Sequence, residues 1–148
     1  MAAATSKASN ETQIRELVEA WAKAVRAKDI NGMMSNYAPN VLAFDAVTQL
    51  QLVGLEAVRK RAEEWVSSFQ LPLDYQLRDL TITASDDVAF SHSLNRVSGT
   101  MTNGKPVDMW IRATVCFHKI DGTWLVTHEH ISVPFDVESG KALLELKP

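Results

Sequence analysis

Residues 107–134 read VDMWIRATVCFHKIDGTWLVTHEHISVP, and this stretch decides the fold. β-Branched and aromatic residues dominate both of its halves, and the pair Asp121-Gly122 between them is typical of a tight hairpin turn. The stretch therefore predicts two long antiparallel strands, over residues 107–119 and 123–134.

Two further runs of the same character come before this hairpin, over residues 75–84 and 88–99, so the second half of the chain predicts a four-stranded antiparallel meander. Upstream, apolar residues recur every three or four positions, as in amphipathic helices. The predicted helices cover residues 10–28, 30–37 and 55–71, with short extended segments at 41–47 and 50–53. Helices followed by a meander indicate an α+β architecture, in which a strongly curved antiparallel sheet wraps around three N-terminal helices.

The length of 148 residues matches one domain. We expect a disordered leader over residues 1–9, the domain over residues 10–135 and a tail over residues 136–148. A net charge of −3 provides no attraction for phosphate backbones, and no apolar run is long enough for a bilayer, so we expect neither nucleic acid nor membrane as a partner. With a single cysteine and no signal-peptide pattern, the expected location is cytoplasmic.

The two faces of the last hairpin differ in composition. A three-residue loop with glycine in the left-handed conformation pairs Lys119 with Thr123 and Ala113 with Glu129. One face is then apolar except for Glu129, and we expect it to pack against the helices. A one-residue slip of the loop would exchange the two faces.

The opposite face is rich in aromatic, histidine and arginine side chains, a composition typical of a subunit interface, so we expect a homodimer. The predicted interface residues are Trp110, Arg112, His128, His130 and Ser132. The Trp124 and Val126 side chains belong to the same face in this register.

Two segments, AKDINGMMSNYAPNV at 27–41 and DGTWLVTHEHISVP at 121–134, together with the order of elements, resemble the nuclear transport factor two superfamily. The closest resemblance is to its SnoaL-like and ketosteroid-isomerase-like members, and it spans about Glu11 to Phe135. It implies a cystatin-like conical α+β barrel, usually dimeric, with a pocket between helices and sheet. The superfamily includes isomerases, cyclases, dehydratases and non-catalytic binding domains, so the fold alone does not define the function.

The resemblance also assigns individual positions. An ungapped count puts Asp45 where ketosteroid isomerases carry their general-base aspartate, Trp21 where they carry an oxyanion tyrosine, and Ala113 where they carry a protonated aspartate. Both oxyanion donors are therefore expected to be missing. Glu129, predicted to lie opposite Ala113, is a candidate to replace the lost acid.

Three residues are candidates for catalysis. Asp45 follows an apolar strand, where a carboxylate is either a turn cap or a base. Glu129 is expected to have a raised pKa because of desolvation, unless it pairs with a buried basic group. His92 shares the apolar side of its strand with Phe90 and Leu94, where it either shuttles a proton or is a satisfied core residue.

The expected pocket wall consists of apolar and aromatic residues that are compatible with a core role as well as with ligand binding. They are Trp21, Tyr37, Trp65, Phe90, Ile111, Ala113 and Ile131. His128 and His130 lack the third and fourth ligands that zinc needs, and no nucleotide-binding glycine motif occurs, so we expect no metal and no cofactor.

Together these features predict a small cytoplasmic homodimer that binds an apolar, polycyclic or enone-like molecule. The predicted chemistry is cofactor-free proton transfer of the isomerase, cyclase or dehydratase type, with Asp45 as base and His92 or Glu129 supporting the developing oxyanion. The alternative is a non-catalytic ligand-binding or assembly module.

Overall fold

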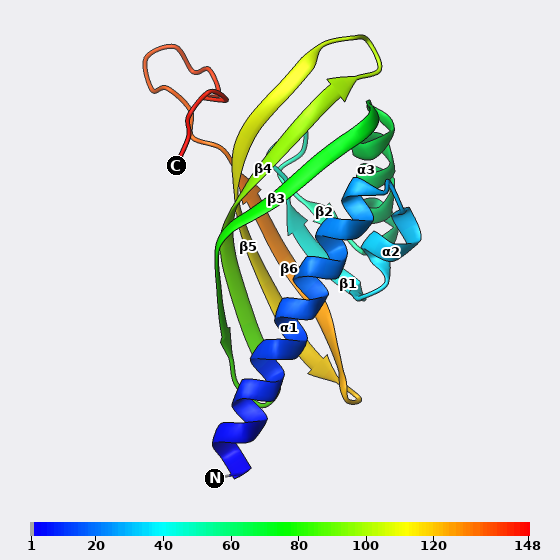
Figure 1. Ribbon diagram of the computed structural model, residues 1–148, viewed down its shortest axis with the longest axis vertical. Coiled ribbons are helices and arrows are strands. Elements are labelled where there is room, and N and C mark those ends of the chain that lie inside the picture. The colour runs from blue at the N-terminus through cyan, green and yellow to red at the C-terminus, as the bar shows by residue number, and fades with distance from the viewer. Residues whose placement is uncertain (1) are drawn as a thin grey trace.

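The protein is described by a computed structural model that covers the backbone of residues 2–148 and the side chains from Ser9 onward. Within this range, the helices and strands follow the predicted order (Figure 1). The helices are α1 (Ala2–Arg26), α2 (Ile30–Met34) and α3 (Leu55–Ser67). The strands are β1 (Tyr37–Phe44), β2 (Leu52–Val53), β3 (Phe69–Ala84), β4 (Val88–Met101), β5 (Pro106–Ile120) and β6 (Thr123–Ser132).

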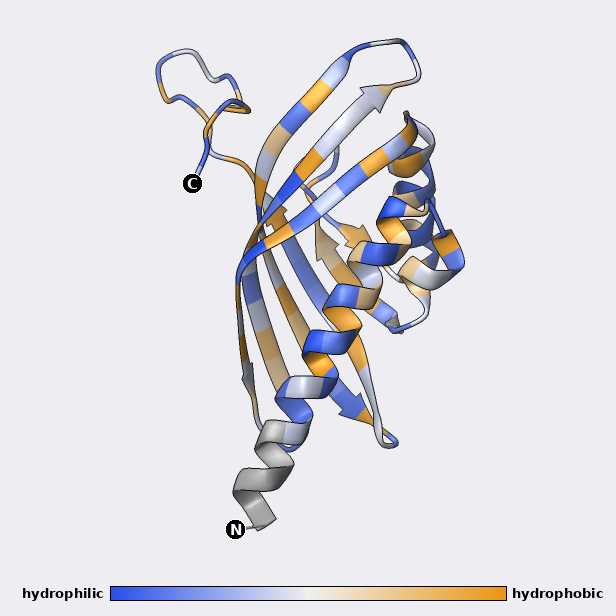
Figure 2. Cartoon of the chain, viewed as in Figure 1, coloured by the Kyte–Doolittle hydropathy of each residue, from blue (hydrophilic) through white to orange (hydrophobic). Residues whose placement is uncertain are grey.

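The strands form one curved sheet in the order β2-β1-β6-β5-β4-β3, which confirms the α+β class and the meander from β3 to β6. All neighbours are antiparallel except β1 and β6, which run parallel, so the sheet is mixed and not purely antiparallel as expected. α1 crosses the sheet diagonally, while α2 and α3 gather at one end of it (Figure 1). Hydrophobic and hydrophilic residues alternate along α1 and along the strands, as two-sided elements require (Figure 2).

The main core lies between these helices and the inner face of the sheet. Its largest fully buried side chains come from both layers, and burying each contributes about 1.5–3 kcal/mol. They are Tyr75, Phe117, Ile14, Met33, Val25 and Val41. Among the helices of residues 2–148, none combines the length and the apolar character that crossing a bilayer takes.

The N-terminal segment differs from the expectation of a disordered leader, because α1 already begins at Ala2. Its alanines favour the helical state, which extends the helix beyond the amphipathic part. Asn10 is therefore inside a helix, where its 3% exposed side chain donates to Ser85 O (3.1 Å) and accepts from Lys119 Nζ (3.2 Å). These bonds attach α1 to the β3–β4 turn and to β5.

The third helix is shorter than predicted, because it ends at Ser67 and β3 begins at Phe69. Pro72, which directly follows the predicted helix, lies in β3. A proline is tolerated there because β3 is an edge strand of the sheet.

The β5–β6 hairpin turns over two residues rather than three. Ile120 pairs with Thr123, and Asp121 and Gly122 both have positive φ values, 51° and 79°, as a type I′ turn requires. The predicted pairing of Lys119 with Thr123 is therefore wrong by one residue.

A β-bulge then shifts the register a second time. Phe117 pairs with Val126 and Cys116 pairs with His128, which leaves Thr127 as the extra residue. Between the turn and the bulge, the two faces of β6 are consequently exchanged relative to the prediction. Beyond the bulge the two shifts add up to two residues, so the predicted faces are restored.

The register shifts in β6 change which of its side chains are buried and which residues they pair with. Trp124 and Val126, predicted on the outer face, are buried at 3% and 7% exposure. Glu129 lies on the inner face as predicted, but it is paired with Val115 and not with Ala113.

Candidate functional site

A cavity of about 660 Å³ lies between the helices and the inner face of the sheet. Small-molecule sites in proteins commonly have volumes of about 300–1,000 Å³. A smaller inner chamber of about 80 Å³ adjoins it. The two share the wall residues Trp21, Tyr37, Tyr75, Glu129 and Ile131.

Glu129 is the titratable group on that shared wall. It comes from β6, is half-buried, and accepts a hydrogen bond of 2.5 Å at Oε2 from the hydroxyl of Tyr37, the first residue of β1. Burial raises the pKa of the Glu129 carboxyl to about 7, the Tyr37 hydrogen bond partly offsets this, and the charge of Asp45 raises it further. A carboxyl group with this pKa is populated in both protonation states near neutral pH, so it can either accept or donate a proton.

An aromatic cluster surrounds this pair. Trp21 stacks on Trp65 with ring centroids 6.4 Å apart, and the Tyr75 ring is edge-on to both, at 5.3 and 5.9 Å. Burial and the charge of Glu129 raise the pKa of the Tyr37 phenol well above its ordinary value, and Trp21, beside the Tyr37 hydroxyl, acts in the opposite direction. The buried Nε1–H of Trp21 nonetheless has no hydrogen-bond partner of standard geometry among the described residues.

A row of polar side chains on β4 completes the inner chamber. Ser93 Oγ donates to Asn95 Oδ1 and Asn95 Nδ2 donates to the Tyr75 hydroxyl, each at 2.7 Å. Burial raises the pKa of the Tyr75 phenol, so the phenol stays protonated. Ser91, two residues before Ser93 on the same face, also lines the chamber.

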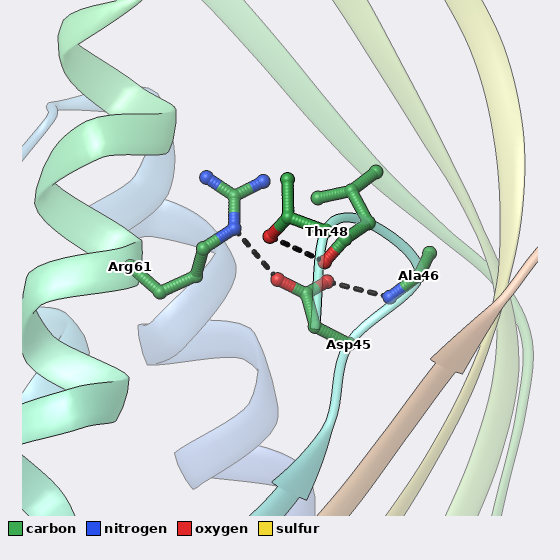
Figure 3. Close-up of polar contacts among 5 residues, drawn as sticks. Asp45, Ala46, Thr48 and Arg61 are labelled. Atoms are coloured by element: carbon green, nitrogen blue, oxygen red, sulfur yellow. Dashed lines mark hydrogen bonds and ion pairs between the residues drawn. The ribbon is translucent and has the colours of Figure 1, made fainter. Parts of the chain in front are cut away.

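Asp45 lies at the end of β1, at the wall of the larger cavity. Its Oδ2 pairs with Nε of Arg61 from α3 at 2.7 Å, and its Oδ1 accepts the Ala46 N–H at 2.7 Å (Figure 3). Both carboxylate oxygens are therefore engaged, one with a cation.

His92 does not reach the cavity, so its expected position is wrong. It is exposed on the outer face of the sheet together with Phe90, which is 45% exposed and therefore no pocket residue either. On β4 the residues that face inward are Ser91, Ser93 and Asn95. The prediction placed His92 at the cavity because its face of the strand also carries the apolar Phe90 and Leu94. On β4, however, the face toward the cavity is more polar than the outer face.

The other predicted wall residues do lie at the cavities. Trp21, Tyr37, Trp65, Ile111, Ala113 and Ile131 line one or both of them. Five further wall residues were not predicted from the sequence: Tyr75, Ser91, Ser93, Asn95 and Arg61. The serines and Asn95 follow the period of two that marks one strand face, and this signal could have identified them as a set.

The predicted interface residues lie on the outer face of β5 and β6. Arg112 pairs with Ser132, and its Nε donates to Ser132 Oγ at 3.0 Å. The ring of His128 contacts Leu42 O through Nδ1 at 2.6 Å. Within the described part of the chain, no group of three or more His, Cys, Asp or Glu side chains is arranged to hold a metal ion.

The C-terminal tail contributes to the wall of the larger cavity. Phe135 and Ala142 form a single β-bridge, and Leu143 N donates to Pro134 O, so the tail folds back on itself. The following residues, Leu144 and Glu145, line the cavity.

A conical α+β fold with helices over a cavity on the inner face of a curved sheet defines the NTF2-like class of proteins. Residues 14–136 match the SnoaL-like domain family, and the chain belongs to this family. This result confirms the resemblance found in the sequence.

Solved structures agree with this assignment. An NTF2-like protein of unknown function from Pseudomonas putida is 39% identical, with a TM-score of 0.88 over 95% of this chain and 98% of that one. A proposed dehydratase of the NTF2-like family from Streptomyces avermitilis is 15% identical, with a TM-score of 0.74 over 85% and 97% of the two chains.

A proposed calcium/calmodulin-dependent protein kinase II association domain from Xanthomonas campestris is 22% identical, with a TM-score of 0.71 over 90% and 87% of the chains. At such identities the likeness to this domain and to the dehydratase shows the fold alone. No curated protein matches the chain.

Proposed function

We propose that this protein binds an apolar small molecule in its conical cavity and transfers a proton to or from it with its own side chains. The reaction class is isomerisation, cyclisation or dehydration. The observation that carries the proposal is the Glu129 carboxyl, which has a pKa of about 7 and faces a cavity of about 660 Å³ with largely apolar and aromatic walls. A base or acid poised near the working pH is what proton transfer at carbon requires.

Within this proposal Glu129 is the proton-transferring group and Tyr37 orients its carboxyl through their hydrogen bond. Asp45 stays a candidate base from the sequence, but its ion pair with Arg61 argues for a different role. Its negative charge raises the pKa of Glu129 and so keeps that carboxyl titratable near neutrality. The tyrosine hydroxyls of the cavity provide donors for a developing oxyanion.

The test is hydrogen exchange at carbon. The bicyclic ketone 2-tetralone, incubated with the protein in D₂O at pH 7, should incorporate deuterium next to its carbonyl faster than in buffer, as followed by NMR. Glu129→Gln should reduce the protein-dependent rate by about a hundredfold to ten-thousandfold. The matched variant Glu138→Gln, at an exposed glutamate of the tail, should keep the rate. Equal rates for the wild type and Glu129→Gln would refute the role of Glu129.

A second candidate function is that of an assembly module, with or without a bound ligand. It is favoured by the outer face of β5 and β6, which carries Trp110 and exposed Arg112 on β5 and exposed His130 on β6. We propose that this face pairs with a second copy of the chain, since Trp and Arg are enriched in interfaces. Combining Trp110→Glu with Arg112→Glu should then halve the mass measured by solution scattering. An unchanged mass would contradict the proposed homodimer.

A further inference from the structure

The inner chamber contains a hydroxyl group that no described residue satisfies. Ser91 is 3% exposed and lines this chamber. Its Oγ makes no hydrogen bond with any residue from Ser9 onward. Among the described residues only the indole nitrogens of Trp21 and Trp124 are buried without a partner, so the Ser91 Oγ is open to the chamber and can form a hydrogen bond with a group that enters it.

The neighbouring polar groups are already engaged with one another. Ser93 donates to Asn95, and Asn95 donates to the hydroxyl of Tyr75. This chain of hydrogen bonds holds the three side chains in place. Ser91 is therefore the hydroxyl of the β4 row that remains available to a ligand.

The strand register relates Ser91 to the titratable group of the site. Ser91 pairs with Val115 on β5, and Val115 pairs with Glu129 on β6. Ser91 and Glu129 thus flank Val115 in one row across three strands. Their backbone positions are about 9.6 Å apart, the distance of two strand spacings. Both side chains line the chamber, so a group bound over Val115 lies between them.

The size of the chamber limits what this group can be. Its volume is about 80 Å³. A cavity of about 150 Å³ is known to accept benzene, so the inner chamber is too small for a ring and accepts a substituent of only a few atoms. The adjoining cavity of about 660 Å³ has room for a polycyclic body.

We infer that the inner chamber is a subsite for one small oxygen-bearing substituent, a hydroxyl or a carbonyl, of an apolar ligand whose body fills the larger cavity. Ser91 Oγ is its hydrogen-bond partner, on the side opposite Glu129. The inference rests on the proposed function, because it specifies the ligand of the same site.

The experiment compares two probes of equal ring size, 2-naphthol and 2-methylnaphthalene, whose substituents differ in hydrogen-bonding capacity. Affinities are measured at pH 7 by equilibrium dialysis for the wild type, for Ser91→Ala, and for Ser98→Ala as a control on the same strand outside both cavities. Ser91→Ala should weaken binding of 2-naphthol by about threefold to tenfold and change that of 2-methylnaphthalene by less than about twofold. Ser98→Ala should leave both affinities as in the wild type, and thermal unfolding checks that each variant is folded.

Each other outcome is decisive. If Ser91→Ala binds 2-naphthol as tightly as the wild type, or loses affinity equally for both probes, the subsite does not exist as described, while apolar ligand binding by the cavity stands. If the wild type binds neither probe, the proposed function itself fails, and the subsite with it.

Discussion

Replacing Glu129 by glutamine removes one titratable group from the cavity wall with little change in size, and its effect on stability should depend on pH. The folded protein holds the Glu129 proton with a pKa of about 7, against 4.5 for an ordinary glutamate. The folded state therefore binds this proton more tightly than the unfolded chain. The resulting stabilisation is fully present below about pH 4.5 and is lost as the pH rises through about 7.

The interval between these two pKa values corresponds to about 3 kcal/mol in the free energy of unfolding. Glutamine does not titrate. As the pH rises from 4 to 8, the free energy of unfolding of Glu129→Gln should therefore increase by about 3 kcal/mol relative to that of the wild type. Because both proteins share all other ionisable groups, their difference isolates Glu129.

The assay is urea denaturation of both proteins, followed by circular dichroism at a fixed protein concentration at pH 4, 6 and 8. Glu138→Gln provides the control, since that side chain is exposed on the tail and should show a difference from the wild type that changes little with pH. A difference between the wild type and Glu129→Gln that stays constant with pH would refute the reasoning. So would a relative loss of stability at pH 8.

Three other substitutions test separate parts of the structure. Tyr37→Phe deletes the hydroxyl that lowers the pKa of Glu129, so that pKa should rise above about 7, and a lower value in an NMR titration of the labelled carboxyl would contradict the geometry. Asn10→Ala breaks the bonds that tie α1 to the β3–β4 turn and to β5 and should cost about 1–3 kcal/mol in urea denaturation, whereas no loss would mean that water replaces both bonds. Gly122→Ala should cost about 1–2 kcal/mol of stability because φ is 79° at this position. A Cβ there would meet no atom within 4 Å, so the loss would come from the backbone conformation alone, and an unchanged melting temperature would contradict the turn assignment.

The order and type of the elements were predictable because they depend on local periodicity. Three-and-four spacing in the first half and strand-forming runs in the second half define the helices and the meander without long-range information. The aromatic wall was predictable for the same reason, since Trp21 and Trp65 lie on apolar helix stripes. Glu129 stood out as one carboxyl on an otherwise apolar strand face.

The predictions that failed concern strand pairing and the face of a strand that points to the cavity, both of which change when the register shifts by one residue. The two-residue turn and the bulge at Thr127 each shift β6 by one position, and such shifts depend on how the strand packs and not on its composition. His92 was assigned to the cavity because its strand neighbours are apolar, yet the structure exposes it and turns Ser91 inward. A strand with mixed composition on both faces carries no local signal that distinguishes inside from outside.

The sequence by itself determined the fold class, the family and the residue types available for chemistry, because each follows from local patterns along the chain. Only the tertiary structure decided how these residues meet. It brings Tyr37 to Glu129 across 92 positions, binds Asp45 to Arg61, and aligns Ser91 with Glu129 over two strand pairings. Distances between remote side chains, and the pKa values that depend on them, follow from packing and desolvation, which exist only once the chain is folded.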